Sequence, residues 1–443
     1  MNDLTQGPVG RHLLKFAGFI ALTTFFQTLY FLVDLYFVGR LGRDAVAGVS
    51  LSGNLMMIVL ALTQSLGVGA TALVAQATGA RDYARANRLF NQAFVMSSLT
   101  GLGFGVIVLI ARDAYVEALA ADAGTAREAH NYLAWFLPAL VLQFGLVALG
   151  SALRGIGDMK MPAAMQVGTV LLNIVLAPVL IVGWGTGRPL GVAGAGLASF
   201  IAIAAGTVAF VLYFRRPSSR VRFHPLQWRP DLALWRQMLG IGLPAGGEFA
   251  LIAIYMVVVY DIIQGFGAAA QAGFGIGGRL MQALFLPAVA IGFATAPVVG
   301  QNFGARLGDR VRHAFYAAAA MTAAVMAIMT ALCRLAPAAL VRLFSADPAV
   351  VAFGTEYLRI VSWNFVASGV IFAGSSALQG LGNSRPALAA SALRLVLFAV
   401  PAYALSRQPS FQMRHVWYLS VGSVFMHMGL LLWLVRREFN AKL

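Results

Sequence analysis

Long apolar segments recur along the whole chain, and each is about long enough to cross a membrane. About 20 consecutive apolar residues span the hydrocarbon layer of a bilayer. Six such segments come first, at residues 13–38, 51–74, 90–110, 132–149, 163–182 and 192–214. After a basic stretch, six more follow at 238–263, 280–299, 314–332, 357–378, 387–405 and 416–435. The pattern predicts an all-α integral membrane protein with twelve transmembrane helices.

The two groups of segments match each other at a constant offset of 225 residues. The offset pairs Gln76, Gly79, Ala80 and Arg81 with Gln301, Gly304, Ala305 and Arg306, and Gly42, Gly155 and Gly157 with Gly267, Gly380 and Gly382. We interpret this as a duplication. Because each half holds an even number of helices, the pseudo-two-fold axis between them is expected to run along the membrane normal. The predicted parts are an N-terminal six-helix lobe (1–214), a cytoplasmic basic linker (215–236) and a C-terminal six-helix lobe (237–443).

The distribution of charge indicates how the chain is oriented in the membrane. The net charge is +16, but only 11% of the residues are charged and 60% are hydrophobic. The basic residues lie in alternate connections and at the ends, which favours membrane topology over nucleic-acid binding. They include Arg81, Arg85, Arg88, Arg154, Lys160, Arg215, Arg216, Arg220, Arg222, Arg229, Arg236, Arg306, Arg310, Arg312, Arg11, Lys15, Arg436, Arg437 and Lys442. We therefore predict a multi-pass protein with both termini in the cytoplasm. The compact loops and the absence of organelle-specific signals favour a prokaryotic inner membrane.

Three carboxylates stand out because they lie inside predicted spans, where a charge is costly unless it faces a cavity or finds a partner. These are Asp34 in the first helix and Glu248 and Asp261 in the seventh. Tyr30 and Gln27 precede Asp34 by four and seven residues, so they share its helical face. Such a carboxylate can bind a proton, or a sodium ion if neutral oxygens converge on it. The alternatives are a structural Asp34 paired within the bundle, and Glu248 and Asp261 titrating near an interface.

Other polar residues inside the spans are expected to form hydrogen bonds between helices. They include Asn54, Gln64, Tyr132, Gln143, Asn173, Asn364, Arg394 and His427. The sequence has no His/Cys metal motif, no Walker-type phosphate loop and no nucleophile–base signature, so we expect neither an enzyme nor an ATP-driven pump, and no cofactor. The single cysteine, Cys333, is expected to be a buried small hydrophobe.

Five short segments together resemble those of a known family. They are residues 38–42 (VGRLG), 74–80 (VAQATGA), 152–158 (ALRGIGD), 191–195 (GVAGA) and 297–302 (PVVGQN). Over nearly its whole length the chain is similar to multidrug and toxic compound extrusion (MATE) transporters of the bacterial type. The resemblance implies an antiporter that exports amphipathic, often cationic drugs or metabolites in exchange for H⁺ or Na⁺. A cleft between two lobes that rock against each other suits alternating access, and we expect a monomer. The resemblance also implies ion coupling through Asp34 with Tyr132 and Asn173.

The remaining candidate residues complete the predicted site. Glu248 and Asp261 are further ion-coupling candidates. Asp34 could be a ligand of Na⁺ as the coupling ion, and no structural metal is expected. The candidate substrate-binding residues are Gln27, Tyr30, Tyr36, Asn54 and Ser199.

The chain departs from the family pattern at two positions. Ala177 stands where some members carry a second acid one turn after Asn173. Phe19 stands where many members carry a proline in the first helix. The offset of 225 pairs Phe19 with Pro244, so the second half of the chain keeps this proline. We predict that proton-linked bending of the first helix is absent or takes another route. The alternative function is a lipid-linked saccharide flippase of the same superfamily, which would favour a strongly cationic cavity. Arg394 is the only basic residue well inside a span, and this disfavours the flippase.

Overall fold

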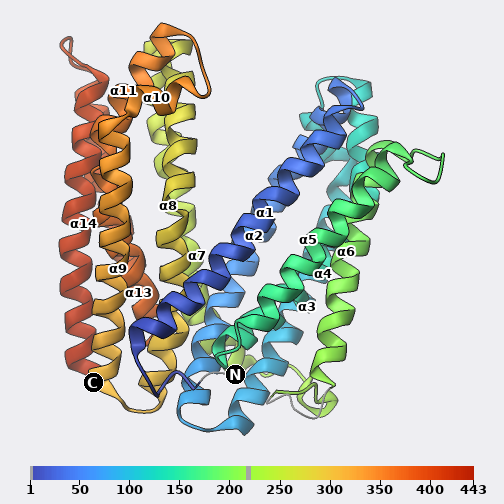
Figure 1. Ribbon diagram of the computed structural model, residues 1–443, viewed down its shortest axis with the longest axis vertical. Helices are drawn as coiled ribbons and strands as arrows, with labels where there is room; N and C mark the ends of the chain where they lie inside the picture. Colours follow the sequence, from blue (N-terminus) through green and yellow to red (C-terminus); the bar gives the residue numbers. More distant parts are fainter. Residues whose placement is uncertain (1–2, 216–220) are drawn as a thin grey trace. The chain divides into compact units, whose positions relative to one another are not determined.

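The structure is a computed structural model, and it describes residues 3–215 and 221–443 (Figure 1). Arg216 and Arg220 of the predicted linker lie outside these residues. Helices and their connections make up the described ranges, which contain no strand. Helices suit a bilayer, because an α-helix pairs its backbone groups within its own segment.

The chain folds into two compact units, and each is described here by itself. Unit 1 contains residues 22–242, and unit 2 contains residues 3–21 together with 243–443. The first half of the chain forms α1 (Val9–Gly39), α2 (Arg43–Gly79), α3 (Tyr83–Leu119), α4 (Ala123–Gly155), α5 (Lys160–Ala177), a π-helical turn (Pro178–Val182) and α6 (Gly191–Phe214). A short 3₁₀ helix (Pro225–Gln227) precedes α7 (Leu232–Ile263). Helices α1 and α7 therefore each contribute residues to both units.

The second half continues with a 3₁₀ turn (Gln264–Phe266) and seven helices. These are α8 (Ala268–Gly304), α9 (Gly308–Leu335), α10 (Pro337–Arg342), α11 (Pro348–Val361), α12 (Asn364–Gly380), α13 (Arg385–Ser406) and α14 (Met413–Lys442). Among the described residues, eleven helices are long and apolar enough to span a membrane, and the bent pair α11–α12 forms a twelfth span. The prediction of a twelve-helix membrane protein is confirmed.

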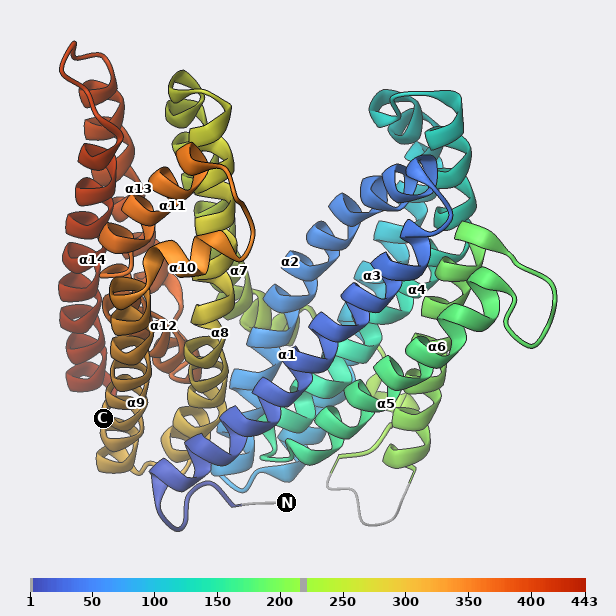
Figure 2. The same cartoon turned by 45° about the horizontal axis from the view of Figure 1, so that its top comes forward.

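The tenth predicted span is broken rather than continuous. Helices α11 and α12 meet at an angle of 53° (Figure 2). Two carbonyl oxygens near the break accept hydrogen bonds from side chains of α9: Ser362 O from Thr330 Oγ1 at 3.0 Å, and Arg359 O from Arg334 Nη1 at 3.2 Å. Such side chains satisfy backbone groups that a bend frees from the helical ladder, so the bend is compatible with a membrane.

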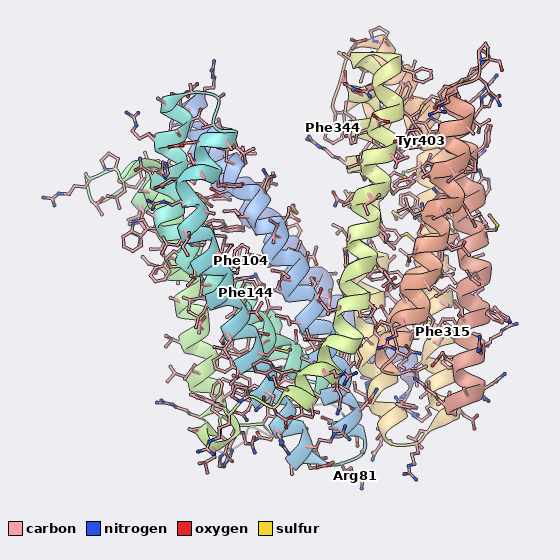
Figure 3. All side chains as sticks on the ribbon, turned by 180° about the vertical axis from the view of Figure 1, so that it is seen from behind. Arg81, Phe104, Phe144, Phe315, Phe344 and Tyr403 are labelled. Carbon is pink, nitrogen blue, oxygen red and sulfur yellow. The ribbon has the colours of Figure 1, made fainter. Side chains whose placement is uncertain are left out.

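The predicted repeat is present in the backbone and in the packing of the two units. Arg81, labelled in Figure 3, has φ of 59°, and so does Arg306 at the offset of 225. A Cβ added to Gly155 would lie 2.9 Å from Thr71 O, and one added to Gly380 would lie 2.6 Å from Ala296 O, the residue 225 positions after Thr71. In both units only glycine allows this close approach of two helices.

Helix α4 is the most enclosed helix of unit 1, with most of its apolar span covered by protein. Phe144 of α4 is fully buried and its ring lies 5.9 Å from that of Phe104 on α3 (Figure 3). The core of unit 2 is built around Trp417 of α14, whose ring stacks on Phe274 at 5.7 Å. The buried polar residues on these two helices include Ser151 on α4 and Ser420 and His427 on α14.

Candidate functional site

The carboxylate of Asp34 is held inside unit 1. It lies near the C-terminal end of α1, one turn after Tyr30, and its side of the helix faces protein: the residue is only 7% exposed. Its Oδ1 atom is buried and has no hydrogen-bond partner among the described residues. A carboxylate oxygen in this state is available to a proton or a cation.

A chain of hydrogen bonds joins α1 to two other helices beside Asp34. The Tyr30 hydroxyl lies 2.9 Å from Ser199 Oγ on α6. Asn173 on α5 donates from Nδ2 to the same Ser199 oxygen at 3.4 Å. The amide oxygen of Asn173 is buried and, within the described part of the chain, unpaired.

Tyr132 adds a fourth helix to this group. It is buried on α4, with its ring 4.6 Å from that of Phe136, and it lies within electrostatic reach of both Asp34 and Tyr30. We call Tyr30, Asp34, Tyr132, Asn173 and Ser199 the Asp34 cluster. Four helices thus bring one carboxylate, one amide and three hydroxyl groups together.

The composition of the Asp34 cluster limits its chemistry to binding protons or hard cations. Oxygen atoms dominate it, and Na⁺ and similar hard cations prefer oxygen ligands. Among the described residues, no three His, Cys, Asp or Glu side chains gather into a group that could hold a metal ion. The cluster contains a single acid, and Ala177, one turn after Asn173, is fully buried.

Three predicted substrate-binding residues do not join the Asp34 cluster. Gln27, Tyr36 and Asn54 are all exposed on unit 1. Tyr36 is 56% exposed and its ring lies under the guanidinium of Arg40, at 4.7 Å. The structure therefore brings together two of the five predicted substrate-binding residues, Tyr30 and Ser199, through their hydroxyl groups.

The other two candidate carboxylates belong to unit 2. Glu248 on α7 accepts a hydrogen bond from Ser375 Oγ at 2.8 Å, and its second oxygen, Oε1, is buried without a partner among the described residues. Asp261 is exposed near the end of α7, where it accepts hydrogen bonds from Tyr403 on α13 (Figure 3) and from Gln264, both at 2.9 Å. Of the two, Glu248 has the environment closer to that of Asp34.

Comparison with known proteins places these residues in a family. The MatE family model matches residues 20–179 and 244–404, one stretch in each half of the chain. This chain belongs to the MatE family. Both matched stretches contain polar residues described above, Asp34 in the first and Glu248 in the second. A MatE protein is a membrane transporter and not an enzyme, as the sequence predicted.

Curated relatives match this MatE chain over most of its length. The Multidrug export protein MepA of Staphylococcus haemolyticus is 26% identical over 389 residues, which cover 86% of this chain and 84% of the relative. The Probable multidrug resistance protein YoeA of Bacillus subtilis is 25% identical over 419 residues, covering 92% and 89% respectively.

Solved MATE structures share the fold. A multidrug resistance MATE family transporter of the MOP superfamily in an outward-facing conformation has a TM-score of 0.89 at 23% identity, with 99% of this chain and 98% of that chain covered. A MATE structure described as the bent conformation has a TM-score of 0.91 at 24% identity, covering 99% and 97%. These likenesses show the fold.

Unit 2 of this MatE protein contains a second polar group that the sequence analysis did not assemble. The Tyr255 hydroxyl lies 2.9 Å from Ser420 Oγ, and Asn364 Nδ2 donates to the same oxygen at 3.2 Å. The offset of 225 pairs Tyr30 with Tyr255, and this pairing was a readable signal. Ser420 follows Ser199 by 221 residues instead, so a fixed offset misses it.

Proposed function

We propose that this protein is a secondary antiporter that exports amphipathic, often cationic compounds in exchange for H⁺ or Na⁺, using alternating access. The observation that carries the proposal is the carboxylate oxygen of Asp34, which is buried and has no hydrogen-bond partner among the described residues. Export of such compounds agrees with the names of the relatives, which are multidrug export and resistance proteins. These names favour drug export over the flippase alternative.

Asp34 is the proposed coupling residue because its carboxylate can bind either the coupling ion or a cationic substrate, but not both at the same time. Tyr30, Tyr132 and Asn173 supply further oxygens to the Asp34 cluster. When Asp34 binds a proton or Na⁺, its charge is neutralised and a cationic substrate loses its attraction to the site. Competition of this kind links the ion gradient to export.

Glu248 and Asp261 in unit 2 are secondary candidates for coupling. The half-buried Glu248 is the stronger of the two, because its buried Oε1 atom is unpaired among the described residues, whereas Asp261 already accepts two hydrogen bonds. We further propose a monomer in the inner membrane with both termini in the cytoplasm. The positive-inside distribution of arginines supports this orientation.

The test is export of ethidium by the full chain in proteoliposomes, driven first by a pH gradient alone and then by a sodium gradient alone. We expect Asp34→Asn to reduce gradient-driven transport at least tenfold, with the effective gradient identifying the coupling ion. Asp113→Asn is the matched control, since Asp113 is an exposed acid of the same unit. Full transport by Asp34→Asn would move the coupling role to Glu248 or Asp261.

A further inference from the structure

Unit 2 holds a cation inside a membrane span, and no anionic side chain among the described residues pairs with it. Arg394 lies near the middle of α13, where a charged side chain is costly unless it has a partner or faces a cavity. Its Nε atom is buried and has no hydrogen-bond partner among the described residues. None of the ion pairs found in residues 3–215 and 221–443 includes Arg394.

The groups around Arg394 come from three other helices. The guanidinium carbon lies 4.9 Å from the ring centroid of Tyr255 on α7, which is a cation–π contact. Tyr255 in turn reaches Ser420 on α14, which also accepts a hydrogen bond from Asn364 on α12. A single cation–π contact with Tyr255 does not offset the cost of the buried charge on Arg394.

His427 extends this group along α14. It follows Ser420 by seven residues, so the two share a helical face, and it lies within electrostatic reach of Arg394. The buried Nε2 atom of His427 has no partner in the described part of the chain. We call Tyr255, Asn364, Arg394, Ser420 and His427 the Arg394 cluster.

Hydrogen-bond donors dominate the Arg394 cluster. Guanidinium N–H groups donate only, and the hydroxyls of Tyr255 and Ser420 and an imidazole N–H can also donate. Asn364 Oδ1 is an acceptor without a partner in the described part of the chain, but it carries only a partial charge. At the offset of 225, buried Val259 stands where unit 1 has Asp34, and Thr169 stands where unit 2 has Arg394. The polar clusters of the two units therefore have opposite charge.

We propose that the Arg394 cluster binds a monovalent anion, either the carboxylate group of an amphipathic organic molecule or a halide ion. One negative charge neutralises one guanidinium, whereas a phosphate dianion would leave an excess charge inside the bilayer. The guanidinium N–H groups match the geometry of a carboxylate. This inference goes beyond the coupling proposal and is tested by binding at equilibrium, without transport.

The experiment measures binding of radiolabelled benzoate to the purified full chain in phosphatidylcholine nanodiscs, in a chloride-free Tris-sulfate buffer. We expect saturable binding at one site per chain, no competition by the neutral isostere benzamide, and at least tenfold weaker binding by Arg394→Gln. Arg407→Gln, at an exposed position just after α13, is the matched control and should bind as the unmodified chain does. Competition by added chloride would show that halides share the site, and its absence would restrict the site to carboxylates.

Several results would overturn the proposal. These are an absence of saturable benzoate binding, equal competition by benzamide, or unchanged benzoate affinity in Arg394→Gln. If Arg394→Gln does not elute as a folded protein, benzoate binding to Tyr255→Phe tests the site instead. This variant keeps the ring under the guanidinium and removes only the hydroxyl. We expect Tyr255→Phe to weaken benzoate binding several-fold, and unchanged affinity would contradict the site.

Discussion

The hydroxyl oxygen of Tyr30 lies 2.9 Å from that of Ser199, and the hydroxyl oxygen of Tyr255 lies at the same distance from that of Ser420. Each pair joins the first helix of a repeat to its last, α1 to α6 and α7 to α14. The duplication has thus kept a polar link in both units while the charge beside it has changed. Asp34 lies one turn after Tyr30, whereas Arg394 lies over the ring of Tyr255.

The link between Tyr30 and Ser199 should stabilise unit 1. We expect a double-mutant cycle of Tyr30→Phe and Ser199→Ala to give a coupling energy of about 0.6 kcal/mol, and at most about 1.7, as for other hydrogen bonds between membrane helices. The measurement is the free energy of unfolding in mixed micelles. Tyr36→Phe, on the same helix but exposed, is the control and should show no coupling to Ser199→Ala. Strict additivity of the two changes would contradict the hydrogen bond.

Gly242 on α7 permits close packing against α2 in unit 1. A Cβ built there would lie 1.9 Å from Ser65 O, so an alanine must push the two helices apart. We expect Gly242→Ala to destabilise the protein by about 1–3 kcal/mol, the usual cost of overpacking. Gly240→Ala is the matched control, because its Cβ would meet nothing within 4 Å. Equal thermal unfolding temperatures for the two variants would refute this packing.

Asn91 on α3 fastens the connection before α7. Its Nδ2 donates to Arg222 O at 2.9 Å, and its Oδ1 accepts from His224 N at 2.9 Å and Trp228 Nε1 at 3.0 Å. We expect Asn91→Ala to speed trypsin cleavage after Arg222 by at least tenfold, because proteolysis needs a locally opened chain. Asn131→Ala serves as the comparison, because this amide on α4 donates to Glu128 on its own helix, at 3.5 Å. No change in the cleavage rate would show that the anchor lies elsewhere.

Asp122 caps the N-terminus of α4 outside the span. Hydrogen bonds from the backbone N–H of Thr125 and then from its side chain hold the pKa of this carboxyl below its ordinary value of 3.8. A lowered pKa means that the cap stabilises the folded state above pH 3.8 and is lost as the pH falls through the folded-state value. We expect Asp122→Ala to lower Tm at pH 6, with the difference from the unmodified chain shrinking below about pH 4.

The control for this pH profile is Glu117→Ala, an exposed acid on α3. It should leave Tm nearly unchanged at both pH values, since surface substitutions usually act within about 0.5 kcal/mol. A Tm difference for Asp122→Ala that stays constant down to pH 3 would contradict a cap that depends on the ionised carboxylate.

Sequence reasoning assembled part of the candidate site and missed the rest for a definable reason. Helical periodicity placed Tyr30 and Gln27 on the face of Asp34, yet Tyr30 binds Ser199 while Gln27 is exposed. Periodicity gives the direction in which a side chain points from its own helix. It does not show which part of that helix face packs against neighbouring helices and which part is exposed. The same limit applies to Tyr36 and Asn54. Both lie inside predicted spans and have side chains suited to binding a substrate, but both are exposed.

The sequence by itself determined the twelve spans and the repeat, because a bilayer requires apolar helices of fixed length and a duplication keeps its offset. It also determined that Val259 occupies the position in the second half that corresponds to Asp34 at the offset of 225 residues. Only the tertiary structure decided that α1 and α7 contribute to both units, that the span at 357–378 bends, and that Arg394 lies over Tyr255. These features depend on distances between residues far apart in the chain, and packing rather than local hydrophobicity sets those distances.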